Sequence, residues 1–181
     1  MTDISASVPE FSRPVRVDHI PATGLSLELK AKPEERKALA ERFGLQSLDS
    51  LEATVTLQAL AGGAVIRLDG HFVARVVQTC VVTLDPVPAQ VEEEFSLSFS
   101  ADAAEDADDI ELSLEEEDPP DPIVGGIIDA GEAVAEHVAL TLDPFPRKPG
   151  IAFDGAETKP AEEEKKPNPF AVLAQLRKNK G

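Results

Sequence analysis

The chain has 181 residues, enough for one domain with a hydrophobic core and some tail, and its formal net charge is −17. This charge disfavours duplex or structured RNA as a partner, since nucleic-acid affinity comes largely from neutralised phosphates. The single cysteine excludes an internal disulfide. The sequence shows neither an apolar stretch long enough to span a membrane nor a signal-peptide pattern. We therefore expect a cytoplasmic protein without a membrane partner.

The first third of the chain predicts two short strands and one helix. Residues 1–12 are expected to form a flexible lead-in, and residues 13–20 and 25–29 to form strands, the second because Leu25, Leu27 and Leu29 alternate with polar residues. Residues 33–43 are typical of a helix, with proline in the first turn and Gly44 at the end. We expect this helix to pack on a sheet.

The centre of the chain, residues 51–99, is the longest block of strand-like sequence. Apolar and polar residues alternate with a period of two over residues 54–59, 66–76 and 94–99, which is typical of strands with one buried face. Residues 61–64 join the first two as a tight hairpin. The second strand is expected to continue through Leu84 and to end at Asp85-Pro86, because proline cannot donate to a ladder. The sequence therefore predicts a three-stranded antiparallel meander.

Residues 101–122 are strongly acidic. Like charges at this density repel one another and extend the backbone, so we expect a loop, with residues 110–114 as a short edge strand within it. The segment lacks the spacing of a calcium-binding loop, and we expect no metal site.

A second helix is predicted from Asp129 to Leu142, with Asp129 as its N-cap and Asp143-Pro144 after its end. Residues 13–152 then form the folded domain, residues 153–167 a linker rich in Glu, Lys and Pro, and residues 168–181 a short amphipathic helix with a basic end. The fold class is α+β, a mostly antiparallel sheet with two packed helices and a disordered C-terminal tail; a barrel-like closure of the sheet remains an open alternative.

Catalytic motifs are missing from the sequence. No phosphate-binding glycine loop, nucleophile elbow or zinc-protease motif occurs, so we expect no enzyme, no catalytic residues and no cofactor. Cys80 could act as a nucleophile only beside a base in an electropositive setting. On the second strand, next to Val81 and Val82, it is expected to be a small buried or half-buried side chain.

The segment from Cys80 to Val87 resembles the signature of the YceD family, the large ribosomal RNA subunit accumulation proteins of bacteria and plastids. That signature, Cys-x-Arg-Cys-Leu-x-Pro-Val, is matched here by Cys80, Leu84, Pro86 and Val87, and an acidic strand with alternating phenylalanines follows. Residues 128–132, 142–144 and 168–173 are also similar, so the resemblance covers most of residues 13–176. Val82 and Thr83 replace the arginine and the second cysteine, so no role that needs a cysteine pair can operate here.

The resemblance implies a non-enzymatic role in the accumulation and assembly of the large ribosomal subunit, through 23S rRNA or a ribosomal protein. The charge distribution favours an acidic surface that binds a basic ribosomal protein or a precursor particle. The residues expected there are Glu92, Glu93, Glu94, Asp108, Asp109, Glu115, Glu116 and Glu117. The alternative is direct binding of 23S rRNA through the C-terminal helix and the few basic residues, namely Arg67, Arg75, Arg147, Lys148, Arg177, Lys178 and Lys180. A second, disfavoured alternative is an enzyme that uses Cys80.

Overall fold

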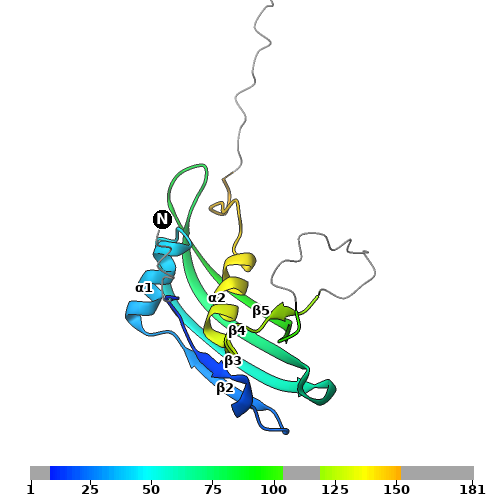
Figure 1. Cartoon of the computed structure of the whole chain (residues 1–181). Coiled ribbons are helices and arrows are strands. Elements are labelled where there is room, and N and C mark those ends of the chain that lie inside the picture. Colours follow the sequence, from blue (N-terminus) through cyan, green and yellow to red (C-terminus); the bar gives the residue numbers. More distant parts are fainter. Residues whose placement is uncertain (1–8, 104–118, 152–181) are drawn as a thin grey trace, which may run out of the picture. The chain divides into compact units, whose positions relative to one another are not determined.

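The computed structural model describes residues 9–103 and 119–151 (Figure 1). Five strands form the main sheet in the order β2-β3-β4-β5-β6, and β1 and β7 form a separate two-stranded sheet. The elements are β1 (Pro14–Arg16), η1 (Val17–His19), β2 (Leu25–Lys30), α1 (Pro33–Arg42), β3 (Ser47–Leu60), η2 (Ala61–Gly63), β4 (Val65–Thr79), β5 (Pro86–Ser100), β6 (Asp121–Pro122), β7 (Ile127–Asp129) and α2 (Ala130–Thr141).

The predicted meander is confirmed and is longer than its alternating segments suggested. Strands β3, β4 and β5 pair antiparallel, with Leu57 opposite Leu68 and Leu68 opposite Leu97. Between β3 and β4 the chain turns at Gly62 and Gly63, whose φ angles of 73° and 98° favour glycine. Strand β2 adds antiparallel to β3, and β6 pairs in parallel with the last two residues of β5.

The predicted end of the second strand was wrong. Strand β4 ends at Thr79, residues 80–85 form the connection, and Pro86 begins β5 rather than ending β4. Pro86 and Pro88 stand opposite Thr79 and Val77. Their backbones face the free edge of β5, where no neighbouring strand needs an N–H donor, so the missing N–H of a proline costs no hydrogen bond. A proline stops a central strand, but it is tolerated at this edge.

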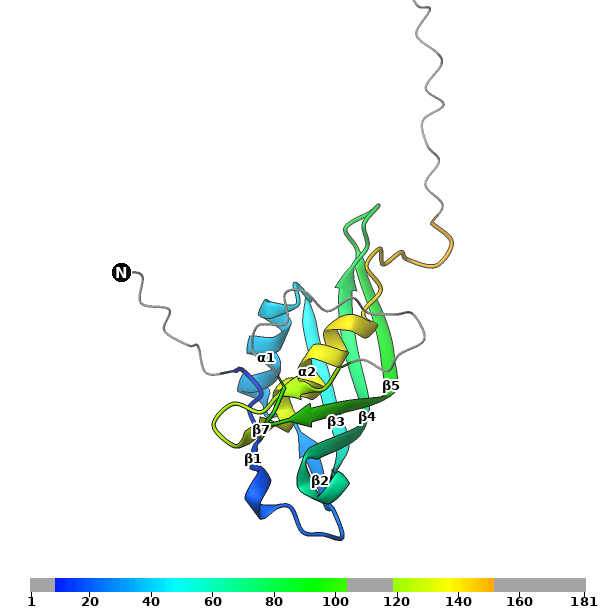
Figure 2. The same cartoon turned by 45° about the vertical axis from the view of Figure 1, so that its right-hand side comes forward.

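Both helices cover the same face of the main sheet (Figures 1 and 2). Their apolar side chains join those of alternate strand residues in one core, which includes Leu39 of α1, Val134 and Val138 of α2, and Phe72 of β4. The bounds of α1 and α2 confirm the two predicted helices to within one or two residues. Asp129 is the N-cap of α2, accepting hydrogen bonds from the backbone N–H groups of Gly131 and Glu132.

The N-terminal segment belongs to the core from residue 11, which corrects the expected lead-in of residues 1–12. Phe11 is fully buried, and the Ser12 hydroxyl donates to Asp129 over 2.5 Å. The expected strand over residues 13–20 is also shorter, because β1 ends at Arg16 and a 3₁₀ turn follows. Arg13 holds Glu35 of α1 by two hydrogen bonds of 2.9 Å, so this segment connects the two helices.

The fold class is α+β with a mostly antiparallel sheet, as predicted. The barrel-like alternative is wrong, because β2 and β6 lie at opposite ends of the strand order and do not pair with each other. No helix in the described part of the chain is long and apolar enough to cross a membrane.

Candidate partner-binding surface

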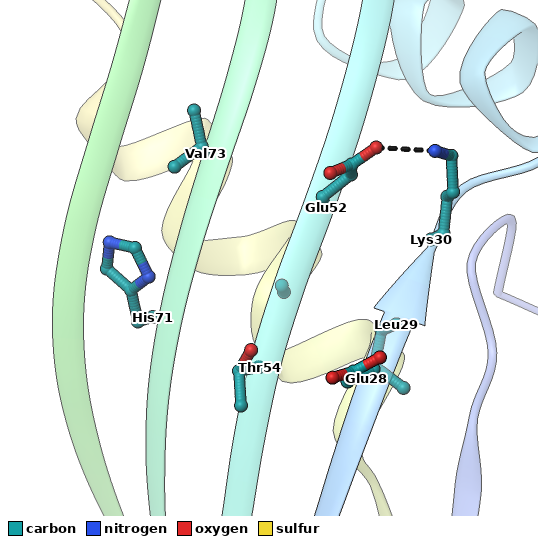
Figure 3. Close-up of a pocket in the computed structure, with 8 residues that line it drawn as sticks. Glu28, Leu29, Lys30, Glu52, Thr54, His71 and Val73 are labelled. Atoms are coloured by element: carbon teal, nitrogen blue, oxygen red, sulfur yellow. Dashed lines mark hydrogen bonds and ion pairs between the residues drawn. The ribbon is translucent and has the colours of Figure 1, made fainter.

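The face of the main sheet that carries no helix is called the outer face here. It is formed by alternate residues of β2 to β5, whose side chains point away from the core (Figure 3). Its charged side chains are Glu28, Lys30, Glu52, Arg67, Asp69, Arg75, Glu92 and Glu94, with His71 near the middle. Carboxylates therefore outnumber the lysine and arginine side chains on this face by five to three.

Most cations of the outer face already have a partner. Lys30 pairs with Glu52 over 2.5 Å, and Arg67 pairs with Asp69 over 2.9 Å. The Nε of Arg75 donates to the Ser50 hydroxyl, which is a neutral acceptor. Within the described residues, neither Glu28 nor Glu94 forms an ion pair with a cation, so the uncompensated charge of this face is negative.

A shallow pocket lies on the outer face between β2, β3 and β4 (Figure 3). Thr54, His71 and Val73 line one side, and the Lys30–Glu52 pair lines the other. His71 reaches across to β5, where its Nε2 lies 2.9 Å from Glu92. The pocket holds no cluster of three metal-ligating side chains, and none was found among the other described residues. It is chemically suited to polar and charged contacts with a partner.

Three consecutive glutamates of β5 do not share one face. Glu92 and Glu94 lie on the outer face, whereas Glu93 lies opposite Phe72 on the face that the helices cover. The Thr141 hydroxyl donates to Glu93 over 2.6 Å, and His137 Nδ1 lies 3.5 Å from the same carboxylate oxygen. The expected acidic surface of Glu92, Glu93 and Glu94 is therefore divided between the two sides of one strand.

A groove beside β5 adds further carboxylates on the helix side. Leu97, Phe99, Val124 and Ile127 line it with apolar surface, and Asp121, Glu132 and Glu136 with acidic surface. Burial raises the pKa of Glu136, and the neighbouring charges of Glu132 and Asp121 raise it further. Because Glu132 is already paired with Arg42 over 2.6 Å, Asp121 and Glu136 carry the available negative charge of the groove.

The matched signature residues lie in and after the β4–β5 connection. Cys80 is fully buried, and its Sγ accepts from the backbone N–H of Thr83 over 3.4 Å. The Thr83 side chain is the largest influence that lowers the pKa of Cys80, to about 6, followed by the backbone N–H groups of Lys148 and Thr83. The buried sulfur therefore serves as an acceptor for backbone N–H groups of the turn.

Leu84 differs from Cys80 in being exposed. It has a φ of 62°, the left-handed conformation that leucine rarely adopts, and 74% of the residue's surface is accessible. Val81 of the same connection and Phe145, which follows α2, are also exposed. Pro86 is exposed and Val87 is half-buried, so the signature combines a buried anchor with an exposed turn.

The basic residues proposed as RNA contacts are scattered over the described part of the chain. Arg67 and Arg75 are eight residues apart on β4, which separates them by about 26 Å. Lys148 follows α2 and pairs with Asp85 over 3.1 Å, and Arg147 lies beside it. Arg67 and Arg75 therefore do not form one basic patch, and the charge of Lys148 is compensated by Asp85.

Several predicted site residues and segments lie outside the described residues. These are Asp108, Asp109, Glu115, Glu116, Glu117, Arg177, Lys178 and Lys180, together with the expected edge strand, linker and C-terminal helix. Conversely, sequence reasoning did not include Glu28, Glu52 and Glu136 in the acidic surface. Glu28 and Glu52 join it through a pairing register that one strand alone does not reveal, and Glu136 joins it through the packing of α2 beside β5.

The family model described as "Large ribosomal RNA subunit accumulation protein YceD" matches residues 68–177. The chain belongs to the YceD family. The match includes most of β4 and all of β5 and α2, so the YceD region supplies Cys80, the three glutamates of β5 and Glu136. No curated protein and no solved structure matches the chain. Membership of the YceD family implies a role in the accumulation of large ribosomal subunit RNA.

Proposed function

We propose that this YceD protein is a non-enzymatic assembly factor for the large ribosomal subunit in the cytoplasm, and that its acidic surface binds a ribosomal protein or a precursor particle. The observation that carries the proposal is the excess of carboxylates on the outer face and beside β5. A protein that binds rRNA must itself present cations to the phosphates, so a ribosomal protein is a basic partner. Complementary charge then selects and steers that partner.

The arrangement of the cations favours a protein partner over naked rRNA. Arg67 and Lys148 are each paired with a carboxylate of the same chain. RNA phosphates would have to displace these carboxylates and would also face the uncompensated charge of Glu28 and Glu94. Direct binding of 23S rRNA therefore remains only the alternative outcome of the experiment below.

The burial of Cys80 supports a function without covalent catalysis. A nucleophile must reach its substrate, and Cys80 is 0% exposed. Its lowered pKa has a structural explanation in the hydrogen bonds of the β4–β5 connection. Full support of ribosome assembly by a Cys80→Ala variant would agree with this reading, and assembly lost by a stably folded variant would contradict it.

The central experiment compares two pairs of charge-neutral substitutions in the full-length protein. We expect Glu92→Gln with Glu94→Gln to reduce co-sedimentation with large-subunit precursors several-fold at low salt. The matched control is Glu34→Gln with Glu41→Gln, which removes the same charge from exposed positions of α1. Equal co-sedimentation of both variants with precursors would overturn the proposal. Neutralising Glu115, Glu116 and Glu117 extends the same comparison to the acidic segment outside the described residues.

A salt titration separates the protein partner from the RNA partner. Binding to naked 23S rRNA would weaken steeply with salt, because each phosphate contact releases counterions. We expect no measurable affinity for naked 23S rRNA under conditions in which precursors are bound. Tight, strongly salt-dependent binding to the naked RNA would favour the alternative function instead.

A further inference from the structure

One edge of β5 is free over most of its length. On one side the whole strand pairs with β4, from Pro86 opposite Thr79 to Ser100 opposite Val65. On the other side, only Phe99 and Ser100 pair with β6. Among the described residues, no strand pairs with residues 86–98 on that side, and Figure 2 shows β5 as the outermost long strand there.

Two observations identify the residues whose backbone groups point out of this edge. The backbone N–H of Ile123 donates to the Ser100 carbonyl over 3.0 Å, so the backbone of Ser100 faces away from β4. Because the direction alternates along a strand, the other even-numbered residues of β5 face outward too. Pro86 and Pro88 have this parity, as expected for residues without an N–H at an open edge.

The free edge therefore offers a regular row of backbone donors and acceptors. After the two prolines, its outward-facing residues are Gln90, Glu92, Glu94, Ser96 and Ser98. The row is about 26 Å long, which matches an added strand of about nine residues. A protein chain can satisfy such a row by pairing with it as an additional strand.

Carboxylates flank the row on both faces of the sheet. Glu92 and Glu94 project on the outer face, Glu93 projects on the helix side, and Asp121 and Glu136 lie in the adjoining groove. Charges on an edge strand prevent pairing with another copy of the same strand, since like charges would meet. The same charges attract a strand of opposite sign.

We propose that residues 90–98 of β5 bind an extended, lysine- or arginine-rich segment of a protein partner by β-strand addition. The backbone of the segment pairs with the free edge, and its alternate basic side chains lie on the outer face, where they meet Glu92 and Glu94. This inference rests on the proposed function and specifies the partner as a basic extended protein segment. Pro86 and Pro88 limit the pairing at the end nearer the β4–β5 connection.

A proline substitution at an outward-facing position tests the backbone contact without changing charge. Ser96→Pro removes one outward N–H and keeps the pairing with β4, as Pro88 does, and Ser96→Ala is the matched control because it keeps the N–H. The probe is a synthetic peptide of about ten alternating lysine and threonine residues. We expect the wild type and Ser96→Ala to bind it equally, and Ser96→Pro to bind at least several-fold more weakly.

Amide hydrogen exchange of the wild-type protein gives a second readout that needs no variant. When the peptide is bound, we expect slower exchange of the amides of Glu92, Glu94 and Ser96. Those of Glu93 and Phe95, which face β4, should change little because they are already paired. This measurement decides the question even if Ser96→Pro fails to fold.

The outcomes separate this inference from the proposed function. Strand addition would be overturned if the peptide bound without protecting the outward-facing amides. It would also be overturned if folded Ser96→Pro bound the peptide with full affinity, because either result would show a contact through charge alone. The proposed function would still stand if Glu92→Gln with Glu94→Gln reduced precursor binding. Protection of β2 amides instead would place the added strand on the wrong edge and would also overturn the inference.

Discussion

Alternate residues of the same strands form the two faces of the main sheet, and the two faces have different roles. On the covered face, Val55, Leu68, Phe72 and Ala74 are completely buried under α1 and α2. On the outer face, residues such as Thr54 and Glu92 are exposed. Burial makes the covered face decisive for stability, whereas exposure leaves the outer face available for binding.

The largest difference in the loss of stability is expected between Phe72→Ala and Thr54→Ala. Phe72 is fully buried, and its ring centroid lies 6.3 Å from that of Phe95. Thr54 lies on the outer face of β3, where it pairs with His71, the residue before Phe72. Phe72→Ala should lower the free energy of unfolding by about 3–5 kcal/mol. Thr54→Ala should change it by less than about 0.5 kcal/mol. Guanidinium denaturation measures both, and similar losses would refute the division between the faces.

A second test concerns the space above Gly70 on the covered face. A Cβ added there would lie 2.4 Å from the Phe95 ring, which stacks on His137 with centroids 3.9 Å apart. We expect Gly70→Ala to lower stability by about 1–3 kcal/mol through overpacking. The double variant Gly70→Ala with Phe95→Leu should lose less stability than the two single variants lose together, because both changes act on one contact. Strict additivity would contradict this explanation.

The same strands show what could be predicted from the sequence. The period of two in β3, β4 and β5 identified both faces, because side chains alternate whatever the partner strand is. The N-cap at Asp129 and the proline in the first turn of α1 are local signals, and both helices were found where predicted. These features depend on neighbouring residues along the chain.

Features that depend on distant residues were missed. Glu28, Glu52 and Glu92 belong to one surface only because the register places β2, β3 and β5 side by side. The buried Phe11 could not be distinguished from a lead-in residue, since its burial depends on contacts with the core. Pro86 was misjudged because only the completed sheet makes β5 a free edge.

Glu92 and Glu93 allow the outer face and the covered face to be compared within a single strand, β5. Glu93 accepts from Thr141 over 2.6 Å and lies near His137, whose Nδ1 is buried and has no hydrogen-bond partner among the described residues. We expect Glu93→Ala to cost about 1 kcal/mol of stability through loss of this hydrogen bond. Glu92→Ala should cost less than about 0.5 kcal/mol, because Glu92 is exposed. A larger loss for Glu92 in thermal or guanidinium unfolding would reverse the assignment of faces.

A further test lies beyond both faces, in the β4–β5 connection, and depends on pH. The Thr83 side chain and nearby N–H groups lower the pKa of the Cys80 thiol to about 6 in the folded protein, below its value in an unfolded chain. The thiolate therefore contributes stability that is fully present above the unfolded-state pKa of about 8.5 and is lost as the pH falls through about 6. We expect the stability difference between wild type and Cys80→Ala to shrink from about pH 8.5 to about pH 5. A difference independent of pH would show that Cys80 contributes only through packing, and an ultraviolet titration of the thiolate would then place its pKa near the ordinary value.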